Sequence, residues 1–81
     1  MRIHVRLNGS LVHHFQQDQV SVKLQGQATV TDLLKALAAQ QPAADGALRA
    51  AVAVVGETHV GRQHPLADQQ EVNLHIPLAG G

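Results

Sequence analysis

The sequence predicts an α+β fold in which a mixed sheet of four to five strands carries one helix across one face. Apolar and polar residues alternate in segments near both ends of the chain, which is the two-residue period of half-buried strands. A central segment instead carries its leucines at three- and four-residue spacings, which is typical of an amphipathic helix. The length of 81 residues suits a single compact core.

Two strands are expected before the helix. Ile3, Val5 and Leu7 alternate with polar residues, so this face of the first strand is predicted to enter the core. A second alternating segment covers residues 20–24, and we expect it to pair antiparallel with the first. The intervening residues 8–19 open with the turn dipeptide Asn8-Gly9, and residues 10–19 are mostly polar, which indicates an irregular connection.

The helix is expected to run from about Thr29 to Pro42. Thr29 and Asp32 stand three residues apart ahead of an apolar run, an arrangement close to a capping box. Pro42 disfavours helical geometry at Gln41 and so ends the helix. The apolar stripe consists of Val30, Leu33, Leu34, Leu37 and Ala38.

In the second half of the chain, the sequence predicts a loop at residues 43–47 around Asp45-Gly46, followed by three more strands. Residues 50–55 form a continuous run of small and β-branched residues, as in a strand covered on both faces. Residues 57–60 are expected to return as a short edge strand, and residues 66–70 to form a turn. The last strand is indicated by the alternation of Val72, Leu74 and Ile76.

The element order favours a layout in which the first and last strands are central, parallel neighbours. This is the ubiquitin-like β-grasp arrangement, with residues 1–76 as the domain and residues 77–81 as a flexible, extended tail ending in Gly-Gly. The side chains expected to meet the leucine stripe are Ile3, Val5, Leu7, Val20, Val22, Val52, Val54, Val72 and Leu74.

Composition excludes several classes of function. Six Lys and Arg balance six Asp and Glu, and Phe15 is the only aromatic residue, so nucleic-acid and membrane-surface binding are disfavoured. No cysteine is present to supply a thiolate or disulfide. No apolar run approaches the ~20 residues of a membrane span, and the alternating N-terminus does not resemble a secretory signal. A cytoplasmic location is therefore expected.

The most informative segment chemically is the ending Ala79-Gly80-Gly81. Glycine backbone passes through slots too narrow for other residues, so such a tail can carry a carboxylate into another protein's active site. Residues 78–81 can reach roughly 13 Å at ~3.3 Å per residue. Pro77 fixes one dihedral and donates no ladder hydrogen bond, so it is expected to end the strand and stiffen the exit of the tail.

The C-terminal third resembles the end of the MoaD/ThiS sulfur carriers. The resemblance rests on residues 64–72, His-Pro-Leu-Ala-Asp-Gln-Gln-Glu-Val, followed by residues 76–81, Ile-Pro-Leu-Ala-Gly-Gly. The capped, leucine-rich helix at residues 29–42 is also similar to this family's helix, and residues 52–57 look like its third strand and turn. The similarity therefore covers nearly the whole chain.

This resemblance implies a carrier, not an enzyme in its own right. The carboxylate of Gly81 would be adenylated with ATP by a ubiquitin-activating-type partner, converted to a thiocarboxylate with a sulfurtransferase, and presented to an acceptor synthase subunit. The chain itself would bind no cofactor, and ATP would be used by the activating partner. The pathway would be of molybdopterin or thiamine type. The residues expected to contact partners are Arg6, His75, Pro77, Leu78, Ala79 and Gly80.

Some residues depart from the family pattern. The family's Asp-Gly-Asp turn is here Asp68-Gln69-Gln70, which lacks the glycine that tolerates positive φ, so a rebuilt turn is expected. His75 replaces what is commonly an aromatic or apolar residue, and Ile76 replaces the first of a proline pair.

Two other functions remain open at this point. The chain could be a ubiquitin-like modifier joined to protein lysines through Gly81, or a non-catalytic interaction domain that uses the fold alone. The six histidines invite a metal site, with His4 and His75 expected on the same solvent face, but no spacing matches a zinc pattern and solvated histidines are favoured. The same face is expected to hold Arg2, Arg6 and Lys23, either as solvated residues or as a basic docking surface.

Overall fold

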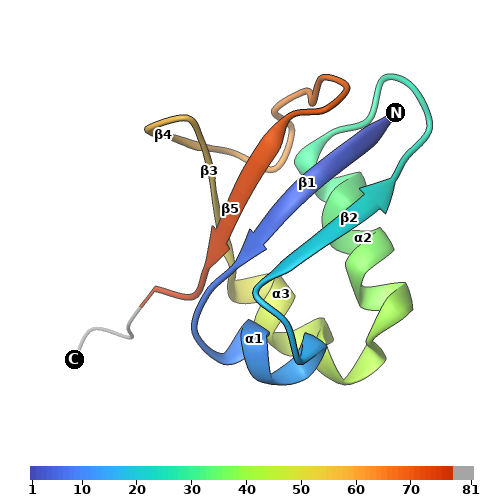
Figure 1. The fold of residues 1–81 in the computed structure, drawn as a ribbon. Coiled ribbons are helices and arrows are strands. Elements are labelled where there is room, and N and C mark those ends of the chain that lie inside the picture. The colour runs from blue at the N-terminus through green and yellow to red at the C-terminus, as the bar shows by residue number, and fades with distance from the viewer. Residues whose placement is uncertain (78–81) are drawn as a thin grey trace.

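The computed structural model describes residues 1–77 and contains a five-stranded sheet with helices on one side (Figure 1). In this part of the chain, no helix has the length and apolar character needed to cross a membrane. The elements in chain order are β1 (Arg2–Leu7), α1 (Ser10–Phe15), β2 (Gln19–Lys23), α2 (Val30–Gln40), the 3-10 helix η1 (Pro42–Ala44), α3 (Asp45–Ala50), β3 (Val52–Val55), β4 (Thr58–Val60) and β5 (Glu71–His75).

The strand order in the sheet is β2-β1-β5-β3-β4, so the first and last strands lie side by side at its centre. β1 pairs parallel with β5, with Val5 opposite Val72 and Leu7 opposite Leu74. The pairs β1–β2, β3–β5 and β3–β4 are antiparallel. The expected β-grasp topology is therefore confirmed.

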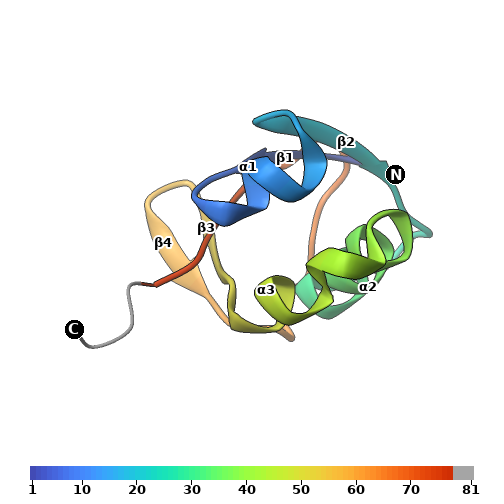
Figure 2. The same cartoon turned by 90° about the horizontal axis from the view of Figure 1, so that it is seen from below.

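The core lies between the sheet and the helices, which Figure 2 shows together on one side of the curved sheet. Ile3, Leu33, Leu37 and Leu74 are fully buried there, at 0% exposure. The opposite side of the sheet, which we call the open face, carries the alternate residues of each strand. Because a strand directs successive side chains to opposite sides, the sheet has one face that packs on the core and one face that is available to partners.

The predicted helix is present as α2, and its start and end follow the expected signals. The backbone N–H of Thr29 donates to Asp32 Oδ2 at 2.9 Å, and the Thr29 hydroxyl donates to the same oxygen at 3.1 Å. These hydrogen bonds hold the pKa of the Asp32 carboxyl below its ordinary value of 3.8. At the other end, Gln41 leaves the helical region ahead of Pro42, with φ −135° and ψ 83°.

The connection between the first two strands is not irregular throughout, because it contains the six-residue helix α1. Leu11 and Phe15, four residues apart, are both buried and close one end of the core. Gly9 precedes the helix with φ 63° and ψ −139°, a conformation that favours glycine. The segment is too short for its apolar period to stand out from its polar residues.

The predicted loop at residues 43–47 is also helical. η1 and α3 occupy residues 42–50, and Ala44 and Leu48 are buried at 0% and 1% exposure. As a result β3 begins at Val52, two residues later than expected. The Asp45-Gly46 turn signal was misleading here because burial of Ala44 and Leu48 outweighs the low helix propensity of glycine.

The predicted inward side of β3 was wrong. Ala53 is buried and lies opposite Leu74, whereas Val52 and Val54 are half-buried and pair with His75 and Asn73 of the open face. A continuous apolar run has no alternation from which to read the register, and a shift of one residue exchanges the two faces. Two valines are thereby placed on the open face.

The turn before β5 contains a left-handed residue although no glycine stands there. Gln69 adopts φ 67°, and its backbone N–H donates to the Arg2 carbonyl at 2.7 Å. The Asp68 carboxylate accepts the Arg2 backbone N–H at 2.8 Å, and this bond holds the pKa of Asp68 below its ordinary value. Contacts with the start of β1 therefore fix the turn. They offset the backbone strain of the left-handed conformation at Gln69, which costs about 1 kcal/mol.

Replacing Asp32 with alanine is expected to destabilise the protein at neutral pH but not in strong acid. Because the folded-state pKa of Asp32 is lowered, its stabilisation is present above the unfolded-state pKa and is lost as pH falls through the folded-state pKa. The free energies of urea unfolding of wild type and Asp32→Ala should therefore differ at pH 7 and converge at about pH 2. Glu57→Ala, in the exposed β3–β4 turn, is the matched control; a pH-independent difference for Asp32→Ala would contradict this assignment.

Candidate functional site

The candidate site is the end of β5, from which the C-terminal segment leaves the sheet (Figure 1). Leu74 is the last fully buried residue before this segment. It lies between Leu7 of β1 on one side and Ala53 of β3 on the other. The base of the C-terminal segment is thus held by strand pairing on both sides and by burial in the core.

Asn8 adds a further contact at this point. Its Nδ2 donates to the Leu74 carbonyl at 3.0 Å across 66 positions of sequence. The sequence indicated only a turn at Asn8, and no local signal could have revealed a bond to the last strand. The bond joins the residue that follows β1 to the backbone immediately ahead of the C-terminal segment.

The residues after Leu74 become progressively exposed. His75 and Ile76 are half-buried, Ile76 packs against the core, and Pro77 is exposed beyond the end of β5. The strand ends before Pro77, as expected from its missing N–H. The other predicted site residues, Leu78, Ala79, Gly80 and Gly81, lie outside the described residues.

The structure places Arg6 and His75 on the open face of neighbouring strands. Arg6 lies opposite Asn73, two residues before His75 on the same side of β5. Arg2 lies opposite Lys23, so the predicted grouping of Arg2, Arg6 and Lys23 on this face is confirmed. Glu71 also lies there, beside His4, and a hollow of about 210 Å³ is lined in part by His4, Arg6 and Glu71.

The histidines of the open face are not gathered into one cluster. The His75 ring makes an edge contact with His59 of β4, with ring centroids 6.1 Å apart, whereas His4 Nε2 lies 2.8 Å from Gln69 Oε1. His4 and His75 share the face but not a site. Across residues 1–77, no group of three or more His, Cys, Asp or Glu side chains is placed to hold a metal ion.

These features define a ubiquitin-like β-grasp domain with a C-terminal segment anchored on its central strand. The ThiS family model matches residues 5–81, which is nearly the whole chain. The protein therefore belongs to the ThiS family, and the resemblance seen in the sequence is confirmed. A search of curated proteins returned no match.

Solved structures share the fold. SAMP1 from Haloferax volcanii aligns with a TM-score of 0.86 at 22% identity, covering 100% of both chains. The Haloferax volcanii HVO 2177 protein gives 0.87 at 23% identity, covering 100% of this chain and 87% of that one. A putative molybdopterin converting factor subunit 1 from Pyrococcus furiosus gives 0.81 at 16% identity, covering 96% and 99%.

Loss of the Asn8 side chain is expected to loosen the base of the C-terminal segment. Asn8→Ala removes a donor from the Leu74 carbonyl and should lower the free energy of unfolding by about 1 kcal/mol. Hydrogen exchange followed by mass spectrometry should show faster exchange at the amides of His75 and Ile76. Asn73→Ala, on the open face of β5, is the control; unchanged exchange in Asn8→Ala would show that the bond does not hold the segment.

Proposed function

We propose that the protein is a sulfur carrier whose reactive group is the C-terminal carboxylate of Gly81. The observation that carries this proposal is the anchoring of β5. Strand pairing, burial and the hydrogen bond from Asn8 fix the chain up to Leu74, and the chain has reached the exposed surface at Pro77. The family match supports it, because it extends through Gly80 and Gly81. A rigid domain that ends in glycines suits the presentation of a carboxylate to a partner.

The chemistry requires activation because a carboxylate is a poor electrophile. In the proposed sequence, a Gly81 oxygen attacks the α-phosphorus of ATP on the activating enzyme, which forms an acyl-adenylate and releases pyrophosphate. A persulfide carried by a sulfurtransferase then attacks the acyl carbon and expels AMP, which forms an acyl disulfide. A second thiol of the partner proteins cleaves the S–S bond of this intermediate and becomes a disulfide with the sulfurtransferase, which releases the thiocarboxylate for the acceptor synthase. The chain supplies the acyl group and its presentation, while the partners supply ATP binding and the sulfur.

The open face next to β5 is the proposed docking surface for the activating enzyme. It combines the half-buried Val52 and Val54 with the cations Arg2, Arg6 and Lys23. The valines offer apolar area next to His75, and the cations offer attraction to an acidic partner surface. Leu78 to Gly81 are the residues that would enter the partner's active site.

Conjugation to protein lysines is the second candidate function. It is favoured by the structural similarity to Haloferax volcanii SAMP1 and to the small archaeal modifier protein 1 of Methanosarcina acetivorans, which aligns with a TM-score of 0.81 at 18% identity over 99% of this chain and 96% of that one. Both functions begin with adenylation of Gly81. They differ in the next bond formed at the acyl carbon, to sulfur or to a lysine amine.

Deletion of Gly81 is expected to abolish ATP-dependent activation. The assay is ATP–pyrophosphate exchange with the cognate activating enzyme, with thermal unfolding as a test that the domain stays folded. Gly46→Ala is a suitable control, because a Cβ at Gly46 meets open space and the residue lies in α3, outside the sheet that contains β5. Exchange at the wild-type rate without Gly81 would exclude both the carrier and the modifier function.

Charge reversal at Arg6 is expected to slow association with the activating enzyme. Arg6→Glu should lower the association rate constant by about threefold to tenfold at low ionic strength, and the effect should shrink as salt is added. Stopped-flow fluorescence with a labelled chain measures this rate. Arg49→Glu, which makes the same charge change on the helical side, is the control; equal rates for wild type and Arg6→Glu would remove the open face from the docking model.

A further inference from the structure

A second hollow lies on the helical side of the molecule, away from the open face. It has a volume of about 390 Å³ and is formed between α2 and α3, with Arg62 from the β4–β5 connection at its rim. This volume falls within the range of sites that bind small molecules or side chains of a partner. We call it the α2–α3 groove.

The groove has an apolar floor and a basic rim. Leu34 and Ala38 of α2 and Leu48 of α3 form the floor. Lys35, Arg49 and Arg62 line the rim and are all exposed. Three of the six Lys and Arg residues of the chain therefore line this groove, whereas only one of the six Asp and Glu residues, Asp45, does so.

Asp45 does not neutralise this rim. Its carboxylate accepts one hydrogen bond from Arg49 Nε at 2.9 Å. The Asp45 side chain is 49% exposed and the Arg49 side chain 80%, so this ion pair contributes little to stability. It is the only ion pair within residues 1–77. Even with Asp45 counted, the rim holds two positive charges in excess while the chain as a whole is neutral.

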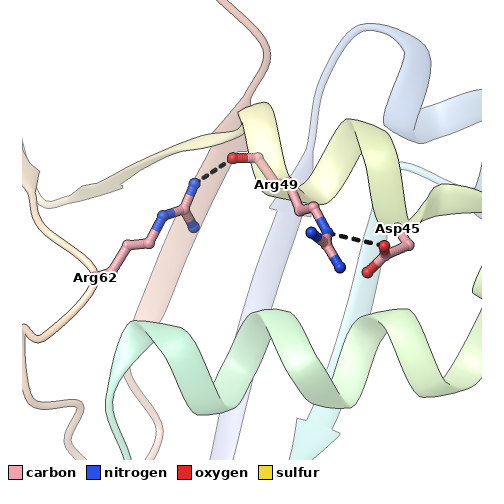
Figure 3. Close-up of polar contacts among 3 residues, drawn as sticks. All are labelled: Asp45, Arg49 and Arg62. Atoms are coloured by element: carbon pink, nitrogen blue, oxygen red, sulfur yellow. Dashed lines mark hydrogen bonds and ion pairs between the residues drawn. The ribbon is translucent and has the colours of Figure 1, made fainter.

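Arg62 is held in place by the backbone on both sides of the groove. Its guanidinium donates to the Arg49 carbonyl at the end of α3 (Figure 3) and to the Ala51 carbonyl at 3.4 Å. Its own carbonyl accepts the backbone N–H of Thr31 at 2.9 Å and the Thr31 hydroxyl at 3.0 Å, at the start of α2. One rim cation is thus positioned before any ligand arrives, which lowers the entropy cost of binding.

We propose that the α2–α3 groove docks an acidic segment of a partner protein, with an apolar side chain such as leucine on the floor and flanking carboxylates on Lys35, Arg49 and Arg62. The charge excess selects an anionic partner, and the apolar floor selects a side chain over a bare phosphate. A nucleic acid is disfavoured because the only aromatic residue, Phe15, is buried in the core and offers no surface for base stacking. This partner would bind while the open face and Gly81 remain available, and the proposal does not depend on the sulfur-carrier function.

The experiment is a titration of the ¹⁵N-labelled full chain with a capped peptide in which leucines are flanked by glutamates. Chemical-shift changes are expected at residues 31–38, 45–49 and 62, and not on the open face. Lys35→Glu and Arg49→Glu should each weaken binding by about tenfold. Lys23→Glu, which makes the same charge change on the open face, should leave the affinity unchanged. If Lys35→Glu unfolds the chain, Lys35→Ala is the milder variant. It is expected to weaken binding, but by less than the roughly tenfold expected for Lys35→Glu.

Several results would overturn the proposal. These are the absence of shift changes up to millimolar peptide, shift changes centred on the open face, and equal weakening by Lys23→Glu and Lys35→Glu. Equal binding of a matched peptide with lysine in place of glutamate would remove the charge argument, and equal binding with serine in place of leucine would remove the apolar one. Tighter binding of a single-stranded oligonucleotide at the same residues would assign the groove to a different ligand.

Discussion

The parallel pairing of β1 with β5 is the constraint on which the rest of the structure depends. It joins the two ends of the chain at the centre of the sheet and sets Leu74 between Leu7 and Ala53. Because Leu74 is fully buried, the backbone that leads to Pro77 is fixed by the same packing that holds the core. The point at which the chain leaves the sheet after Leu74 is therefore set by the whole fold and not by the last few residues.

Much of the fold could be predicted from the sequence because local and global signals agree there. The alternation in β1 and β5, the capped start of α2 and the proline after it each specify one structure. The failures have physical causes. α1 and α3 are six residues long and owe their helicity to the burial of Leu11, Phe15 and Leu48, which a local pattern does not reveal. The continuous apolar run in β3 carries no register information.

The covalent chemistry proposed for Gly81 stays a prediction from the sequence, whereas the structure tests the surroundings of the candidate site. The Gly80-Gly81 ending and Pro77 are visible in the sequence, and the alternation of β1 and β5 places Arg6 and His75 on one face. The bond from Asn8 to the Leu74 carbonyl and the contact of His75 with His59 depend on pairing between distant segments. The split of the cations between the open face and the α2–α3 groove also emerges only from the fold, since the chain as a whole is neutral.

The central claim is that this domain presents the Gly81 carboxylate as its reactive group. Intact mass spectrometry tests it most directly, after incubation of the chain with ATP, the activating enzyme and a sulfurtransferase, and with fragmentation to locate any modification. The account predicts an adenylate and then the exchange of one oxygen for sulfur at Gly81. An unchanged mass under conditions in which a known carrier is converted, or a modification located elsewhere in the chain, would contradict it.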